Sequence, residues 1–358
     1  MKARHILILL ATALMCGACE RTLDFDGPES EKATDLVVNA TAIAGSPLCV
    51  YVSRAYQIDE VPSVMYYDYQ HAVLYRDDFI NDYRVDDYLQ KTAVKQAQVT
   101  AEVVNGDVSY QMAFDEINLM YACNYVPREG DRIRITVQNG TSTVTAETEV
   151  PAKPAIEVVS HEVLPEDPYE DMGDLVNQAD TIMRLTCRIS GVDDNSYYRL
   201  RVRSERSQTL KSESQWGYQW NNNYYVMQDI YFSEDDMFTD NRLTRGFGGW
   251  PAYFSSTFSS EQVGGNSRTF TLDSPLAYIH TLDFNKTTTE DIPEIEPRVM
   301  VELQAVSPDL YRYLKSMELY RISEVDRNAE PTLIHSNVKD GWGIFGSLSF
   351  DRVYIPYD

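Results

Sequence analysis

A run of acidic side chains between Ser233 and Asp240 has the chemistry of a cation site. Asp235, Asp236 and Asp240 offer the hard oxygen ligands that Ca²⁺ prefers. The run lacks the ligand spacing and the central glycine of an EF-hand loop. Calcium is therefore only a candidate ligand here, and we expect no metal and no other resident cofactor.

The common catalytic patterns are missing from the sequence. It contains no G-x-S-x-G nucleophile elbow, no Walker loop and no H-E-x-x-H zinc motif. Neighbouring carboxylates such as Asp193-Asp194 arise by chance in a chain this acidic, and a glycosidase needs two carboxylates at a set separation in space. We expect a protein that is not an enzyme. Hydrolysis of glycans or peptides by an unrecognised carboxylate pair is one alternative.

Two aromatic-rich loops are better candidates for contact with a ligand or partner. Aromatic rings beside Asn and Gln can stack on sugar rings, or supply the hot spots of a protein interface. A strand edge and a packed loop are the structural alternative. The candidate binding residues are Trp216, Tyr218, Trp220, Tyr224, Phe247, Trp250 and Tyr253.

The first residues have the pattern of an export signal. Basic residues precede an apolar run from Ile6 to Met15, which is too short to cross the roughly 30 Å of a bilayer core. The run ends in Cys16-Gly17-Ala18-Cys19, which resembles the lipobox of bacterial lipoproteins. We expect residues 1–18 to be a signal peptide and Cys19 to carry acyl chains. Ordinary secretory cleavage is the alternative, because Cys16 stands where such motifs more often have leucine.

Composition limits the partners. The net charge of −24 disfavours nucleic acid, and it also disfavours anionic lipid headgroups, so membrane contact should come from the acyl anchor. Residues 19–34 read as the lipidated cysteine and a flexible tether. Cys49, Cys123 and Cys187 are expected to be buried free thiols, and a Cys49–Cys123 disulfide is left open.

These candidate sites need a scaffold, and strand patterns predict one in residues 35–152. Apolar residues alternate along Gln98–Val104 and Arg132–Val137. Asn105-Gly106 and Asn139-Gly140 are strong hairpin signals. Short strands separated by turns predict an immunoglobulin-like β-sandwich. A long insert, residues 59–88, interrupts the pattern.

Residues 155–358 read as a second β-rich domain with one short amphipathic helix. The helix is expected from Pro308 to about Arg321, with Ser307 as its N-cap and proline at its first position. Leu310, Tyr313, Leu314 and Met317 form one apolar stripe that should pack on the second sheet. The chain is therefore predicted to be mostly β.

The closing segment is the most specific piece of the sequence. Ser336–Gly346 reads S-N-V-K-D-G-W-G-I-F-G, and its glycines are expected to permit positive φ around two aromatics that plug the sandwich. This run resembles the C-terminal signature of a Bacteroidetes lipoprotein family known as domain of unknown function 4249. Further matching pieces are Leu36–Asn39, Val50–Ser53, Asn195–Arg199, Asp235–Phe238 and Tyr311–Leu314.

The resemblance implies no catalytic residues. It implies a lipoprotein of the outer membrane that accompanies a TonB-dependent transporter. The leading hypothesis is thus a non-enzymatic accessory protein, anchored at the cell surface, that binds a glycan or peptide ligand or a partner. A periplasmic orientation and a structural envelope or adhesin role are the alternatives.

Overall fold

The computed structural model describes residues 35–55, 92–164, 181–213, 219–228, 231–243, 253–276, 296–325 and 332–357. The chain is mostly β with sandwich-like sheets, which confirms the predicted fold class. Thr34–Asp358 forms one compact unit. Within the described ranges, no helix has the length and apolar character needed to cross a membrane. Cys19, the insert 59–88 and the acidic stretch 166–174 lie outside these ranges.

Strands β1 to β7 form the first sandwich around an apolar core. Val99 and Ala101 of β3 pack with Ile133 and Ile135 of β6, and each is at most 1% exposed. The two Asn-Gly turns close the β3–β4 and β6–β7 hairpins as predicted. The strands are β1 (Leu36–Ile43), β2 (Cys49–Arg54), β3 (Gln98–Val103), β4 (Val108–Asp115), β5 (Met120–Ala122), β6 (Arg132–Asn139) and β7 (Ser142–Glu149).

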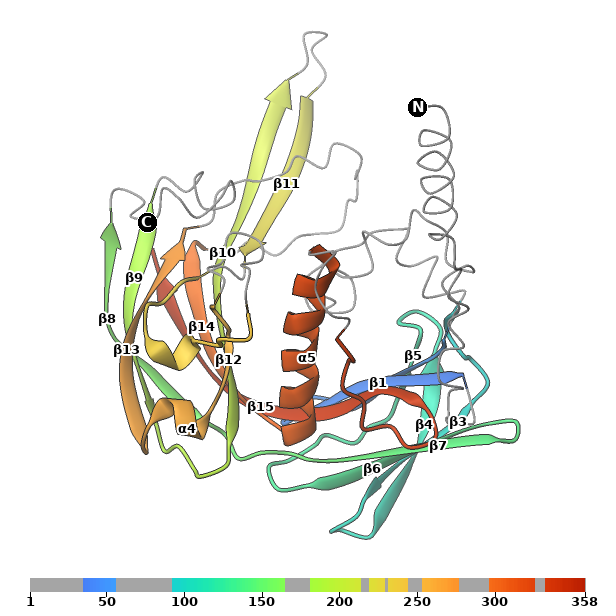
Figure 1. Ribbon diagram of the computed structural model, residues 1–358. Helices are drawn as coiled ribbons and strands as arrows, with labels where there is room; N and C mark the ends of the chain where they lie inside the picture. The colour runs from blue at the N-terminus through green and yellow to red at the C-terminus, as the bar shows by residue number, and fades with distance from the viewer. Residues whose placement is uncertain are drawn as a thin grey trace, which may run out of the picture. The chain divides into compact units, whose positions relative to one another are not determined.

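The later elements, whose arrangement Figure 1 shows, enclose a second core. This core is rich in aromatic rings. Strands β13, β9 and β8 form a three-stranded sheet in that order. The elements are β8 (Ala155–Leu164), β9 (Ile182–Ser190), β10 (Tyr197–Glu213), β11 (Gln219–Gln228), η2 (Asp236–Phe238), β12 (Thr257–Ser259), α4 (Ser260–Val263), β13 (Ser267–Pro275), β14 (Arg298–Val306), α5 (Pro308–Val325) and β15 (Trp342–Pro356).

The last strand, β15, joins the two sandwiches (Figure 1). Its first half pairs in parallel with β1, from Val37↔Trp342 to Ile43↔Leu348. Its second half pairs with β14 in the antiparallel direction, up to Arg298↔Pro356. One continuous sheet therefore runs in the order β11-β10-β14-β15-β1-β2-β5-β4-β3-β6-β7. The domain division at residues 152–155 stays a prediction, since β15 belongs to both sandwiches.

The glycines of the closing segment have two different roles. Gly343 alone among them has a positive φ, +106°, and a Cβ there would lie 2.1 Å from the carbonyl oxygen of Val38. Gly341 and Gly346 instead allow close packing, since a Cβ at either would come within 2.7 Å of a neighbouring side chain. The expectation of positive φ throughout was therefore wrong. Phe345 is fully buried in the first core, whereas Trp342 is 36% exposed, so only Phe345 fills the interior as expected.

Polar side chains fix the segment that leads into β15. The amide of Asn337 donates to the Phe345 carbonyl and accepts from the Phe345 N–H, both at 2.9 Å. His335 Nε2 lies 2.9 Å from a carboxylate oxygen of Asp309 in α5. The segment thus joins the helix to the last strand, which makes it a structural element.

Helix α5 begins at Pro308 as predicted and continues to Val325, beyond the expected end. Ser307 is the residue before the helix, and its carbonyl accepts from the Tyr311 N–H at 2.9 Å. Its hydroxyl does not cap the helix but accepts from the Ser347 N–H of β15 at 3.1 Å. Leu310 packs with Val306 and Leu348, so the apolar stripe meets the sheet where β14 and β15 join.

The cysteines of the described residues are free thiols. Cys187 is buried, and its burial raises the pKa of the thiol to about 12. Cys49 and Cys123 are only half-buried, so their expected burial was wrong. Cys49 stands opposite Ala122 in the β2–β5 pair, which points Cys123 to the other face of the sheet. A Cys49–Cys123 bridge does not form for this reason.

Candidate functional site

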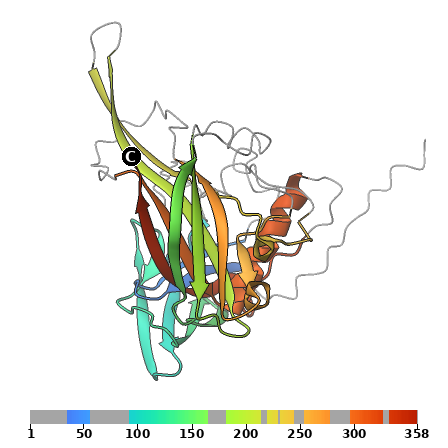
Figure 2. The ribbon, with the colours of Figure 1, turned by 90° about the vertical axis from the view of Figure 1, so that its left-hand side faces the viewer.

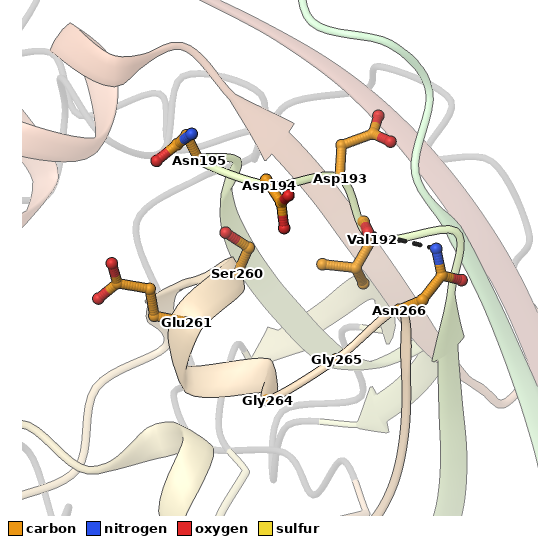
Figure 3. Close-up of a pocket in the computed structure, with 9 residues that line it drawn as sticks. All are labelled: Val192, Asp193, Asp194, Asn195, Ser260, Glu261, Gly264, Gly265 and Asn266. Atoms are coloured by element: carbon orange, nitrogen blue, oxygen red, sulfur yellow. Dashed lines mark hydrogen bonds between the residues drawn. The ribbon is translucent and has the colours of Figure 1, made fainter.

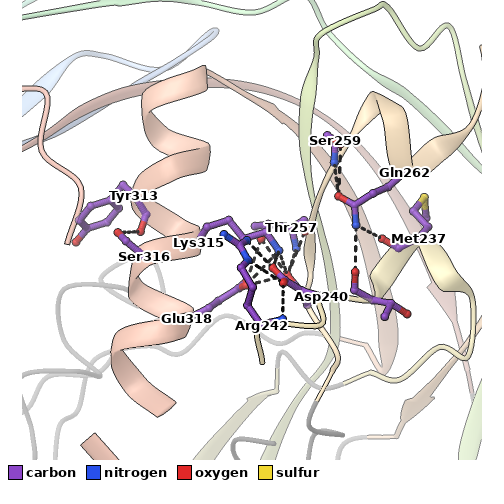
Figure 4. Close-up of polar contacts among 12 residues, drawn as sticks. Met237, Asp240, Arg242, Thr257, Ser259, Gln262, Tyr313, Lys315, Ser316 and Glu318 are labelled. Atoms are coloured by element: carbon purple, nitrogen blue, oxygen red, sulfur yellow. Dashed lines mark hydrogen bonds and ion pairs between the residues drawn. The ribbon is translucent and has the colours of Figure 1, made fainter. Parts of the chain in front are cut away.

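The acidic loop is fixed to the second core by an aromatic anchor. Phe238 is 1% exposed and its ring lies 5.6 Å from that of Phe254 and 5.4 Å from that of Phe270. Asp235 caps η2 by accepting from the Met237 N–H at 3.0 Å. Gln262 of α4 donates to the Met237 carbonyl at 3.0 Å (Figure 4). The loop is therefore a rigid turn.

The candidate calcium ligands face cations of the chain itself. Arg268 pairs with both Asp235, at 2.7 Å, and Asp236. The guanidinium of Arg242 grips Asp240 with two bonds, Nε–Oδ1 at 2.9 Å and Nη2–Oδ2 at 2.7 Å. In the part of the chain that the structure describes, no group of three or more His, Cys, Asp or Glu is placed to hold a metal. The loop oxygens are thus engaged by arginines rather than gathered around a vacant centre.

A buried lysine connects this loop to helix α5 (Figure 4). Lys315 is 5% exposed, and its Nζ lies 3.2 Å from Oδ2 of Asp240 and 3.3 Å from Oε2 of Glu318. It also donates to the hydroxyl of Ser255. Glu318 accepts in turn from Ser255, at 2.8 Å, and from Thr257, at 2.9 Å. The cluster ties α5 to the loop and to β12.

The Ser255–Lys315 pair has the composition of a nucleophile and its base, but its geometry differs from a catalytic one. Such a pair needs a hydroxyl that meets substrate and a lysine that takes its proton. Ser255 is 2% exposed and its hydroxyl donates to Glu318. Lys315 already donates to Ser255 and faces two carboxylates. This arrangement is suited to holding a helix in place.

Asp240 is the electrostatic centre of the cluster. Burial by itself would raise the pKa of its carboxyl group. Hydrogen bonds from Arg242 and the charge of Lys315 outweigh burial and hold this pKa well below its usual range. Because Asp240 stays ionised in the folded chain, the contact with α5 persists at neutral pH.

The structure joins two loops that the sequence analysis had treated separately. The N–H of Asp240 donates to the carbonyl of Tyr253 at 2.7 Å, and Thr239 bridges to Phe254. Tyr253 is 45% exposed at the end of the second aromatic loop. The acidic loop therefore pairs with the described C-terminal end of that aromatic loop.

The remaining aromatic candidates are not brought together with Tyr253 by the described residues. Trp220 and Tyr224 lie on β11, opposite Ser212 and Gln208 of β10. Trp216, Tyr218, Phe247 and Trp250 lie outside the described residues. Their binding role stays a prediction.

A shallow pocket of about 640 Å³ opens beside α4 (Figure 3). Asp193, Asp194 and Glu261 line it together with Asn195 and Asn266. The sequence alone indicated a chance pair at Asp193-Asp194, and it did not predict the pocket. The signal that marks it is a second turn, Gly264-Gly265-Asn266, whose backbone bonds back to Val192 at 3.1 Å.

Comparison with known proteins identifies a family and nothing more specific. The profile of the family described as Domain of unknown function (DUF4249) matches residues 20–352. No curated protein matches the chain. The match covers both sandwiches, so it applies to the whole of the described fold.

Proposed function

Because the chain belongs to the DUF4249 family, we propose that it is a non-enzymatic binding lipoprotein of the outer membrane. Acyl chains on Cys19 hold it there, with residues 20–34 as the tether. It serves a TonB-dependent transporter as an accessory protein facing the cell surface, and it contacts a glycan or peptide ligand or the transporter itself. The sequence resemblance to Bacteroidetes lipoproteins supports this role.

One observation carries the proposal. The side chains most able to do chemistry are used in internal contacts: Lys315 binds both Asp240 and Ser255, and the N–H of Asp240 donates to the carbonyl of Tyr253. A buried network of this kind fixes geometry. It supports the presentation of an aromatic loop from a rigid base, which is what a binding protein needs.

The anchor supports the proposed location. Two or three acyl chains hold a protein firmly on a bilayer, whereas a single chain holds it marginally. The net charge of −24 leaves the acyl chains as the source of membrane attachment. The first strand begins at Leu36, so a short tether separates the anchor from the first sandwich.

The test is affinity purification of the tagged full chain from membranes in mild detergent, followed by mass spectrometry of the proteins that come with it. The Cys19→Ala form is the control. We expect a TonB-dependent transporter in near-equal amount with the native chain and little with the control. Recovery of the acylated chain alone would contradict a stable transporter complex, and release of glycan or peptide fragments by the pure protein would favour the hydrolase alternative.

A further inference from the structure

Within the described residues, strand β8 is an edge strand of the second sandwich. It stands at one side of the three-stranded sheet and, among the described strands, pairs only with β9 (Figure 2). Of its residues only Ile156 is buried. An edge strand presents a row of N–H and C=O groups that a further strand can bond.

The outer part of β8 is regular and apolar enough to take such a strand. A bulge at Val158/Ser160 distorts the edge, but beyond it Ser160 to Leu164 pair evenly with Thr186 to Ile182. Val159 is 53% exposed and Val163 is 51% exposed. Bulges and charged side chains usually keep an edge strand from pairing with another chain. Here the bulge lies before Ser160, so it does not block pairing along Ser160 to Leu164.

The β9 residues that stand opposite the exposed end of β8 are themselves fully buried. Val163 stands opposite Met183, and His161 stands opposite Leu185. Met183 and Leu185 are 0% exposed, although their partners on β8 are exposed. The core is thus closed over β9 and open over the end of β8, so an added strand would extend the sandwich there.

Charge identifies the kind of strand that fits. Glu157 is neutralised by Arg188. Glu162 has no ion pair within the described ranges, since Arg184 opposite it binds Asp273 with two bonds of 2.8 Å. The edge therefore attracts cations and repels a second copy of this chain, which carries −24.

We propose that the edge of β8 from Ser160 to Leu164 is a docking site for an extended, cationic segment of another protein, which adds to the sheet as a strand. Main-chain hydrogen bonds supply the affinity, and the exposed valines together with Glu162 select apolar and basic side chains. The proposal does not depend on the transporter.

The test uses the full chain in mild detergent and a synthetic ten-residue peptide of alternating lysine and valine. We expect the peptide to bind and to slow amide hydrogen exchange in residues 158–164. The Val159→Lys/Val163→Lys variant should weaken binding about tenfold or more. Val108→Lys, which changes a valine that is 43% exposed on β4, is the matched control and should bind like the native chain.

Two further peptides separate strand addition from simple charge attraction. A peptide with the same side chains but N-methylated at every residue lacks the donors of both edges, so it should not slow exchange in β8. A peptide of alternating glutamate and valine should bind about tenfold more weakly or worse. Equal binding of the N-methylated peptide, or slowed exchange only outside β8, overturns the proposal.

Sedimentation of the native chain completes the test. We expect a monomer whose mass does not change in the Val159→Lys/Val163→Lys variant. If the native chain is a dimer and the variant is a monomer, a second copy of the chain occupies the edge. This result also overturns the proposal.

Discussion

The two sandwiches differ in what they bury. Every buried polar residue in the described part of the first sandwich is uncharged, namely Ser53, Thr92 and Thr148. The second sandwich and α5 bury charged side chains throughout the described residues, namely Arg203, Glu205, Asp273, Glu302 and Lys315. The first core is apolar packing with its charges kept at the surface, while the second depends on internal ion pairs.

This difference supports our proposal that the second sandwich carries the binding surface. A buried ion pair often contributes no more stability than apolar residues of the same volume, because its charges lose their hydration. Losing one partner, however, leaves an uncompensated charge. The buried ion pairs of the second sandwich therefore fix the positions of its elements without being required for its stability. We interpret the first sandwich as the scaffold and the second as the part that presents binding loops.

The largest effect is expected where the two regions share a strand. Gly343→Ala places a Cβ against the Val38 carbonyl at a φ of +106°, and we expect it to cost about 4 kcal/mol or more. Urea denaturation measures this loss. Gly140→Ala, at a turn with φ +59° and open space around it, should cost only about 1 kcal/mol. Equal losses of unfolding free energy for the two variants would mean that the strand shared by the two sandwiches is no more sensitive than a surface turn.

The next largest effect is expected at the buried lysine. Lys315→Met leaves Asp240 and Glu318 without their shared cation, so it should lower the free energy of unfolding by about 3 kcal/mol. Lys153→Met removes the half-exposed pair with Asp351 and should cost about 0.5 kcal/mol. If both lysines prove equally dispensable, the contrast between buried and surface charge is wrong.

The pH dependence of Asp240 sharpens the comparison. Its folded pKa lies below its unfolded value, so its stabilisation is complete above about pH 4 and is lost as pH falls through the folded pKa. Asp240→Asn should lower the free energy of unfolding by about 2 kcal/mol at pH 7. The difference in this free energy between the native chain and the variant should become smaller below pH 4. Chemical denaturation at several pH values measures the gap. Glu116→Gln, at a carboxylate that is 73% exposed, should show neither the cost nor the narrowing.

The smallest effect is expected on the first sandwich surface. Glu147 accepts from Arg132 and Arg134, and these bonds, with that from Arg132 foremost, lower the pKa of its carboxyl group. Arg132→Gln leaves the bond from Arg134 in place, so the loss of stability should stay below about 1 kcal/mol. If Arg132→Gln lowers the melting temperature as much as Lys315→Met does, the contrast between the surface of the first sandwich and the buried charge of the second is wrong.

Local patterns were sufficient to predict the first sandwich. The alternation of Ile133, Ile135 and Val137 places all three in the core, and the Asn-Gly turns fix their hairpins. The parallel pairing of β1 with β15 could not be predicted, because it joins the two ends of the fold and leaves no signal in either strand. The start of α5 was predicted from Pro308, but the site that the helix serves was not.

The candidate site was visible only in part. Asp240 was identified from the sequence as a candidate oxygen ligand for a cation. Its partner Lys315 comes from a distant helix, so the sequence could not show that the carboxylate of Asp240 is already in an ion pair. Ser255 and Thr257 drew no attention, because a buried hydroxyl has no sequence pattern. The pairing of the acidic loop with Tyr253 is a product of tertiary structure.

The central claim is that the second sandwich, not the first, contacts the partner. Hydrogen exchange on the full chain, alone and in the complex recovered from membranes, tests it most directly. The account predicts slower exchange in the described residues 155–164, 231–243 and 253–276, with no change in β3 and β6 of the first core. Slower exchange confined to residues 98–149 would contradict it and make the first sandwich the binding domain.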